Sequence, residues 1–296
     1  TPSIASRPSD RITRSGRYAG HQFEQDTAPR LLPADGRPAY DRSLVRPRSD
    51  AAVFPIRDLN PTRVFPYVTL LLIAANALVY FFWQPHGGPQ EAQFLYRHAA
   101  IACEVTTGQP LTVEEYQLDV CRQNAPGEAI FPNKAVTLSL FVSMFLHGSL
   151  FHLLGNMWFL WLFGNNIEEA YGPLRFLLVY LFSGLIAAVG FIALNPDSIT
   201  PFIGASGAIA GVLGAYLILF PGRWVISLVV ITLLPIPAAV FLGLWFVMQF
   251  LVGDPGVAWE AHVIGFLAGA AITVLFRGPL LRRIERIHRR LPPVWS

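Results

Sequence analysis

GASGAIAGVLGAYLILF, residues 204–220, contains no charged side chain, and its glycines and alanines recur at helical spacing. The chain around it is 53% hydrophobic and only 14% charged, which is too apolar for an ordinary soluble domain of 296 residues. A bilayer core of ~30 Å is crossed by about 20 apolar residues in a helix. We therefore predict a membrane-spanning helix over residues 205–220.

Outward from this run, similar apolar stretches alternate with short polar or Pro/Gly breaks. They predict five further crossings, at residues 66–83, 149–167, 174–194, 224–252 and 259–276. The fold class expected is an all-α polytopic membrane protein, built as a bundle of six transmembrane helices. An even number of crossings places both ends of the chain on one side.

Basic residues gather at the two ends of the chain. Residues 1–61 form an arginine-rich arm with no apolar stretch, which we expect to be disordered, and residues 277–296 form a basic amphipathic tail, which we expect to lie along the cytoplasmic leaflet. By the positive-inside rule both termini are predicted to be cytoplasmic. The arginines then set topology near anionic lipid, and we expect no nucleic-acid partner.

The connection between the first two predicted crossings, residues 84–148, is long and rich in acids, so we expect an external loop. Its residues 135–146 are apolar but too few to cross, which favours a short helix at the membrane surface. Both cysteines, Cys103 and Cys121, lie in this loop, on the side where disulfides form. A disulfide, two free thiols and a metal site with His98 are all compatible with the sequence.

Polar side chains inside spans are costly, and each is a functional candidate. Ser206 and His262 each lie fourteen residues before the inner end of their span, so at ~1.5 Å per residue both lie ~21 Å from it and roughly 10 Å below the outer edge of the core. His152, on the predicted second span, lies at a similar depth. Asn156 follows one helical turn deeper on the same face.

Small residues predict that the spans carrying Ser206 and His262 pack closely. They recur every four residues as Gly207 and Gly211 on the one, and as Ala261, Gly265 and Gly269 on the other, a pattern that lets helix backbones approach in lipid. Close helices at equal depth would bring His262 within reach of the Ser206 hydroxyl.

These residues suffice for acyl transfer. A serine becomes nucleophilic when a neighbouring base takes its proton, and His262 could be that base. The Asn156 and His152 side chains and the Ser206 amide could stabilise an oxyanion. We expect a dyad because no acid lies at this depth and Glu260 faces elsewhere on its helix. No metal is expected, since His147 and His152 lack the spacing of a zinc motif.

Three motifs resemble those of the rhomboid intramembrane proteases. They are H-x4-H-x3-N (His147, His152, Asn156), G-x-S-G-x3-G (Gly204, Ser206, Gly207, Gly211) and A-H-x2-G-F-x3-G (Ala261, His262, Gly265, Phe266, Gly269). The resemblance covers residues 62–276 and implies a six-helix protease core with a Ser206/His262 dyad and oxyanion donors at His152, Asn156 and the Ser206 amide. It also implies a structural role for His147, a buried helix-end carboxylate at Glu168, and transmembrane substrates that enter beside the fifth span.

From these features we expect an intramembrane serine endopeptidase that needs no cofactor. It would cleave single-span or polytopic membrane proteins near the outer face, and it would reside in the bacterial inner (plasma) membrane. Two alternatives stay open: a catalytically inactive relative that binds membrane clients, and a transporter that uses His147, His152 and Asn156 as a polar pathway. The sequence does not determine the oligomeric state.

Overall fold

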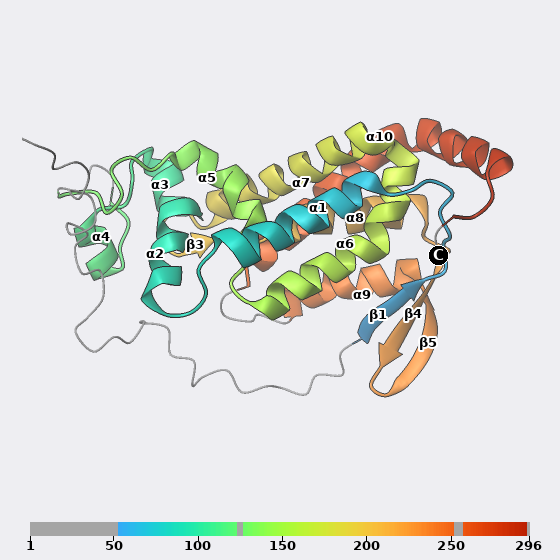
Figure 1. The fold of residues 1–296 in the computed structure, drawn as a ribbon, viewed down its shortest axis with the longest axis horizontal. Coiled ribbons are helices and arrows are strands. Elements are labelled where there is room, and N and C mark those ends of the chain that lie inside the picture. The colour runs from blue at the N-terminus through green and yellow to red at the C-terminus, as the bar shows by residue number, and fades with distance from the viewer. Residues whose placement is uncertain (1–52, 123–126, 252–256, 295–296) are drawn as a thin grey trace, which may run out of the picture. The chain divides into compact units, whose positions relative to one another are not determined.

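The computed structural model of the chain describes residues 53–122, 127–251 and 257–294. The elements before the bundle centre are β1 (Val53–Asp58), α1 (Tyr67–Leu78), the π-helical η2 (Val79–Trp83), α2 (Gly88–His98), β2 (Ala100–Ile101), α3 (Ala102–Thr107), α4 (Val113–Leu118), α5 (Val136–Val142) and the 3-10 turn η3 (Ser143–Phe145). They are followed by α6 (Leu150–Tyr171), α7 (Pro173–Leu194), β3 (Pro201–Phe202), α8 (Ser206–Leu219), β4 (Trp224–Val229), β5 (Thr232–Pro237), α9 (Ala238–Leu251) and α10 (Trp259–Arg290). Figure 1 shows the long helices side by side, with α8 between α6, α7 and α10.

Among the described residues, α7 and α10 are long and apolar enough to cross a bilayer. A third span is possible if the α5–η3 segment is counted with α6, although the two are bent by 77°. The apolar helices Tyr67–Trp83, α8 and α9 are shorter. Six crossings therefore stay a prediction, while the helical bundle itself agrees with the expected polytopic class.

The prediction of one helix over residues 224–252 is wrong. Residues 224–237 form the β4–β5 hairpin, and only Ala238–Leu251 is helical. The reason is local chemistry, because the run is dense in Trp, Val, Ile and Thr, which favour strands, and Pro235 and Pro237 cannot continue a helix. Hydropathy alone does not separate these two structures. The chain is therefore not all-α.

The arm predicted to be disordered up to residue 61 also needs correction. Residues 1–52 lie outside the described residues, but Val53–Asp58 forms β1, which pairs antiparallel with β4 in a three-stranded sheet of order β1-β4-β5. The sheet is bonded to the bundle: the Tyr216 hydroxyl donates to Asp58 at 2.7 Å, Asn166 donates to Asp58 at 2.8 Å, and the Trp158 indole donates to the Pro55 carbonyl at 2.7 Å.

The predicted boundary at residue 276 is not a break in the structure. Helix α10 continues through Pro279 to Arg290, and Leu280 and Ile284 are buried in the main core instead of facing a leaflet. The extension is held at its far end by His288, whose Nε2 lies 2.6 Å from a Glu169 carboxylate oxygen. Residues 277–290 are thus part of the bundle.

A carboxylate near the end of α6 holds the start of α1. Glu168 is buried and accepts hydrogen bonds from the Val68 amide at 2.9 Å, the Thr69 amide at 2.8 Å and the Thr69 hydroxyl at 2.8 Å. The first amides of a helix lack partners within it and favour negative charge. Glu168, the helix-end carboxylate that the motifs implied, thus caps α1.

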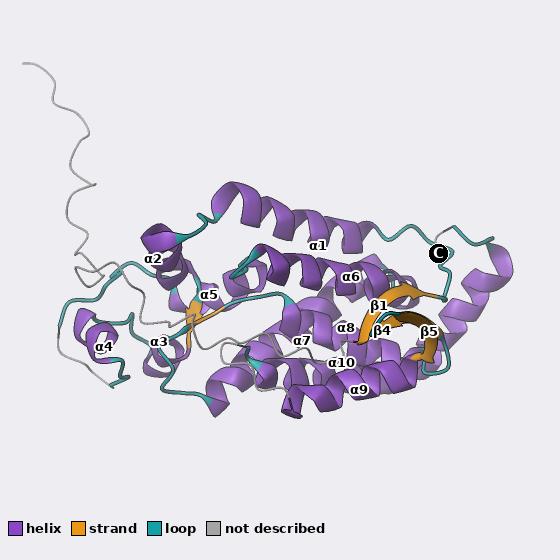
Figure 2. Cartoon of the chain, turned by 90° about the horizontal axis from the view of Figure 1, so that it is seen from below, coloured by secondary structure: helices purple, strands orange, loops and turns teal. Residues whose placement is uncertain are grey.

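The segment predicted as an external loop, residues 84–148, contains α2, α3 and α4 and the short apolar helix α5 expected within 135–146 (Figure 2). Cys103 and Cys121 are joined in a disulfide with a Cα separation of 5.6 Å. The His98 ring packs instead against the Trp83 and Phe94 rings, at 4.9 and 4.5 Å, so it takes no part in a site with the cysteines.

A buried ion pair ties α3 to the end of this segment. The Lys134 ammonium lies 2.5 Å from a Glu104 carboxylate oxygen, and both side chains are almost fully buried. Burial raises the pKa of Glu104 and lowers that of Lys134, and the attraction between the two charges opposes both shifts. The pair and the disulfide hold the loop from two sides.

Candidate active site

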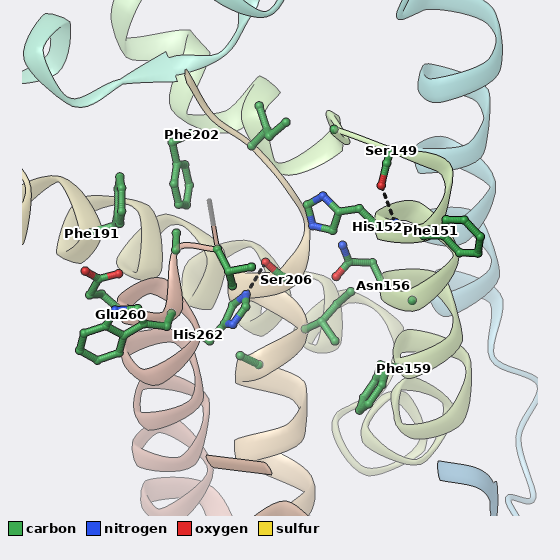
Figure 3. Close-up of a pocket in the computed structure, with 18 of the residues that line it drawn as sticks. Ser149, Phe151, His152, Asn156, Phe159, Phe191, Phe202, Ser206, Glu260 and His262 are labelled. Atoms are coloured by element: carbon green, nitrogen blue, oxygen red, sulfur yellow. Dashed lines mark hydrogen bonds between the residues drawn. The ribbon is translucent and has the colours of Figure 1, made fainter. Parts of the chain in front are cut away.

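Ser206 and His262 meet at the first turns of two neighbouring helices. Ser206 opens α8, and Gly204 just before it has a φ of +121°, a conformation that favours glycine. His262 lies in the first turn of α10. Its Nε2 is 2.8 Å from the Ser206 hydroxyl oxygen (Figure 3), so the structure brings the predicted nucleophile and base into hydrogen-bond contact.

Glycines allow this contact because they let α8 and α10 touch through their backbones. A Cβ added to Gly265 would lie 2.1 Å from the Gly207 carbonyl oxygen, and one added to Gly269 would lie 2.0 Å from the Gly211 carbonyl oxygen. Any side chain at either position would push α10 away from α8. The predicted small-residue faces are therefore the surfaces through which the two helices pack.

Gly214 belongs to the same contact, and the sequence reasoning missed it. A Cβ added to Gly214 would lie 2.1 Å from the Phe266 carbonyl oxygen. The sequence does contain a pattern that indicates it, because Gly214 follows Gly207 and Gly211 along one helix face.

Gln249 on α9 is a second residue that the sequence reasoning missed. Its side-chain oxygen lies 2.7 Å from His262 Nδ1, and its side-chain nitrogen donates to the Trp245 carbonyl at 3.0 Å. That second bond orients the amide so that the oxygen faces His262. An oxygen can only accept, so Nδ1 must carry the proton, and Nε2 is left free to accept from Ser206. The signal was an amide side chain in the otherwise apolar helix α9.

Asn156 and His152 project from successive turns of α6 toward Ser206 (Figure 3). All three line one cavity. The Asn156 amide nitrogen is buried and has no hydrogen-bond partner among the described residues. A buried donor without a partner is costly, and in a cavity beside a serine it is available to an incoming oxygen.

The His152 ring packs against the backbone at Gly204, where an added Cβ would lie 2.9 Å from its Cε1. His147 lies behind it, fully buried, with the two rings 5.1 Å apart. The side-chain amide of Gln84 bonds to both the carbonyl and the amide of His147, at 2.5 and 3.1 Å. Gln84 thus holds the backbone just before α6, and the buried His147 ring packs against His152, which is compatible with a structural role.

The cavity has a volume of about 1070 Å3 and is bounded by α6, α7, α8, α9 and α10 and by β3. Its walls include the aromatic side chains of Phe159, Phe191, Phe202, Trp245 and Trp259. Glu260 also lines it, but the hydrogen bond of its carboxylate is with Asn195, at 3.5 Å, and not with His262. A cavity of this kind suits a large apolar ligand with a reactive polar group.

Within residues 53–122, 127–251 and 257–294, the grouping with metal-ligand geometry is Cys103, Glu115 and Cys121. Its sulfurs are bonded to each other. Ser206 and His262 are not part of that grouping.

A serine paired with an oriented imidazole, beside a donor without a partner, is the arrangement on which serine hydrolases depend. Here it lies among apolar helices, which points to a hydrolase of the membrane. The comparisons agree, and the chain belongs to the rhomboid family. The family model of the Rhomboid domain matches residues 134–279.

The relatives found include proteases of this family. The rhomboid relative YdcA of Bacillus subtilis is 30% identical over 218 residues, which are 72% of this chain and 89% of YdcA. The rhomboid protease GluP of the same organism is 41% identical over 78 residues, 26% of this chain and 15% of GluP. The human presenilin-associated rhomboid-like protein is 39% identical over 87 residues, 28% of this chain and 22% of that protein. The chain is thus an integral membrane protein, and its relatives support a role in intramembrane proteolysis.

Proposed function

We propose that this chain is an intramembrane serine endopeptidase in which Ser206 is the nucleophile and His262 the general base. The observation that carries the proposal is the 2.8 Å contact between His262 Nε2 and the Ser206 hydroxyl. Glu260, the acid nearest His262 in the sequence, bonds elsewhere, so the pair acts as a dyad.

In the first half of the reaction, the Ser206 oxygen attacks the substrate carbonyl carbon while His262 Nε2 takes the hydroxyl proton. The carbonyl oxygen becomes an oxyanion, which the Asn156 amide, the His152 ring and the Ser206 backbone amide stabilise. The carbon–nitrogen bond then breaks, His262 returns the proton to the leaving amine, and an ester on Ser206 remains.

In the second half, a water molecule gives its proton to His262 and attacks the ester. The acid product leaves and the proton returns to Ser206. No cofactor takes part in either half. Gln249 acts as a positioning residue, because it keeps the Nδ1 proton in place and leaves Nε2 ready to accept.

The substrates proposed are transmembrane segments of single-span or polytopic membrane proteins, cut near the outer face. Ser206 lies at the first residue of α8, so at ~1.5 Å per residue it is about 20 Å from the other end of that helix. The aromatic cavity between α6 and α9 would receive the apolar segment. Its lateral route passes Phe159 and Phe241, whose rings stack at 6.5 Å across these helices.

Six membrane crossings, cytoplasmic termini and residence in the bacterial inner membrane complete the proposal. The arginines at both ends support this orientation. Lipid and membrane-protein substrates are then the partners, with no role for nucleic acid.

The test is cleavage of a purified reference transmembrane substrate by four forms of the chain in detergent. Wild type and Ser183→Ala should cleave it, because Ser183 is a buried serine on α7 that does not contact His262. Ser206→Ala and His262→Ala should not. A fluorophosphonate should label wild type on Ser206. Cleavage by Ser206→Ala at the wild-type rate would refute Ser206 as the nucleophile, and no cleavage by wild type would favour a client-binding or transport role.

A further inference from the structure

The β4–β5 hairpin exposes a continuous apolar surface outside the bundle. Residues 224–237 read WVISLVVITLLPIP and include no charged side chain. The side chains of Trp224, Leu233 and Leu234 are 49%, 58% and 44% exposed. Exposed apolar surfaces of this kind mark sites of contact with a membrane or with another protein.

The turn at the tip of the hairpin is formed by apolar residues, which hairpin turns rarely contain. Val229 pairs with Thr232, so Val230 and Ile231 form the connection, a place where water-exposed hairpins prefer Asn and Gly. Val230 has a φ of +58°, which a β-branched residue rarely adopts. Val230 and Ile231 are nevertheless 65% and 89% exposed. A strained turn kept apolar indicates that the tip meets an apolar medium.

The base of the hairpin is fixed where the hairpin joins α9 and where it pairs with β1. The Ala238 amide donates to the Arg223 carbonyl at 2.7 Å, and the Leu59 amide donates to the Trp224 carbonyl at 2.8 Å. The pairing of β1 with β4, and the bonds of Asp58 described above, extend this attachment.

The free edge of the sheet is poorly suited to a polypeptide partner. Alternate residues of an edge strand direct their amides away from the paired strand, and Pro235 and Pro237, two residues apart, fall in that outward set without an N–H to offer. Proline at an edge is a device against strand addition. The apolar surface therefore favours lipid over another chain.

The location of the hairpin agrees with lipid. It follows the end of α8, the helix that starts at Ser206, and thus lies at the bundle end opposite the cavity, next to the start of α9 (Figure 1). Val240 and Leu244 of α9 are 49% and 51% exposed and continue the apolar surface of the hairpin along the bundle. Arg223 and Trp224, at its base, are residue types enriched where a bilayer meets water.

We propose that the β4–β5 hairpin is an interfacial anchor, with Val230 and Ile231 inserted at the boundary of headgroups and acyl chains in the leaflet opposite the cavity. Open strand edges are not tolerated in the hydrocarbon centre, which places the hairpin at this boundary. The anchor does not depend on which residues are catalytic.

A single introduced thiol tests this. Both cysteines of the chain are in the disulfide, so Ile231→Cys can be labelled alone with an environment-sensitive fluorophore. The matched control is Glu285→Cys, an exposed position at the same end of the bundle, with 67% of the side chain accessible. Both proteins are placed in nanodiscs of phosphatidylcholine and phosphatidylglycerol, with and without lipid that carries a quencher high on the acyl chain.

The label at residue 231 should emit at shorter wavelength than the control and lose most of its fluorescence to the lipid quencher. The label at residue 285 should be little affected. Equal, weak quenching at both positions would overturn the proposal, as would a shift at residue 231 that appears only when a substrate polypeptide is added. Leu233→Cys provides a second labelling position, and thermal unfolding in detergent verifies that each labelled protein is folded.

Discussion

The side-chain oxygen of Gln249 lies 2.7 Å from Nδ1 of His262, on the ring edge opposite the nitrogen that meets Ser206. A neutral amide thus occupies the place that a carboxylate takes in a catalytic triad. It can orient the imidazole, but it offers less charge stabilisation to an imidazolium.

Gln249→Leu should lower kcat by about ten- to a hundredfold, less than the ~10⁴-fold loss that follows from removing the orienting carboxylate of a triad. KM should change little, because the residue holds the base and not the substrate. Steady-state cleavage in detergent measures both constants. Gln249→Glu restores an acceptor oxygen and should recover activity. Equal losses in both variants would contradict an orienting role.

Asn156→Ala should reduce kcat by about 10²- to 10³-fold, since one oxyanion donor is removed. The fold should survive, because the Asn156 amide nitrogen has no hydrogen-bond partner to lose among the described residues. Fluorophosphonate labelling of Ser206 and the thermal midpoint separate the two effects. A wild-type rate in this variant would exclude Asn156 from the oxyanion site.

Gly269→Ala should destabilise the protein by about 1 to 3 kcal/mol or prevent folding, because overpacking would force α10 away from α8. The added Cβ would lie 2.0 Å from the Gly211 carbonyl oxygen. Gly243→Ala is the matched control, since a Cβ at Gly243 meets nothing within 4 Å. Thermal unfolding in detergent should leave the control unchanged or slightly stabilised.

Reduction of the Cys103–Cys121 disulfide should lower the free energy of unfolding by about 3 kcal/mol. The disulfide closes a loop with a sequence separation of 18, and this loop lowers the entropy of the unfolded chain. The paired variant Cys103→Ser/Cys121→Ser should show the same loss without reductant. Mass spectrometry of a non-reduced digest detects the bridge itself. An unchanged midpoint on reduction would contradict the predicted contribution of the disulfide.

Stability should depend on pH through Asp58. Burial raises its pKa from an ordinary value of 3.8 to about 7, opposed by hydrogen bonds from Tyr216 and Asn166 and by the charge of Arg223. The folded state thus favours the protonated acid, and its contribution is full below pH 3.8 and is lost as pH rises toward 7. The thermal midpoint of wild type should fall across this window relative to Asp58→Asn. Parallel curves for the two proteins would contradict the assignment.

The sequence was informative where a pattern repeats along a single helix. The glycines predicted to lie on two helix faces form the contact between α8 and α10. The polar residues expected at one depth line the cavity. The apolar run 174–194 corresponds to α7. These features depend on local spacing along single helices. They can be read from one segment at a time.

The sequence was misleading where pairing across the chain decides the structure. The run 224–252 is apolar throughout, but its first half is a hairpin that pairs with β1, more than 160 residues earlier. Gln249 was missed because its role depends on the contact between α9 and α10. Leu280 and Ile284 resembled a surface helix, since their burial requires partners elsewhere in the bundle.

The pairing of β1 with β4 also bears on where the domain can be cut. A fragment limited to the matched residues 134–279 would lose β1, the α1 residues capped by Glu168, and His288, the partner of Glu169. It would keep Ser206 and His262. However, β4 would lose the strand it pairs with, and the carboxylates of Glu168 and Glu169 would lose these hydrogen-bond partners. The unit held together by these contacts is therefore longer than the matched residues, and residues 53–288 are the shortest stretch that retains all of them.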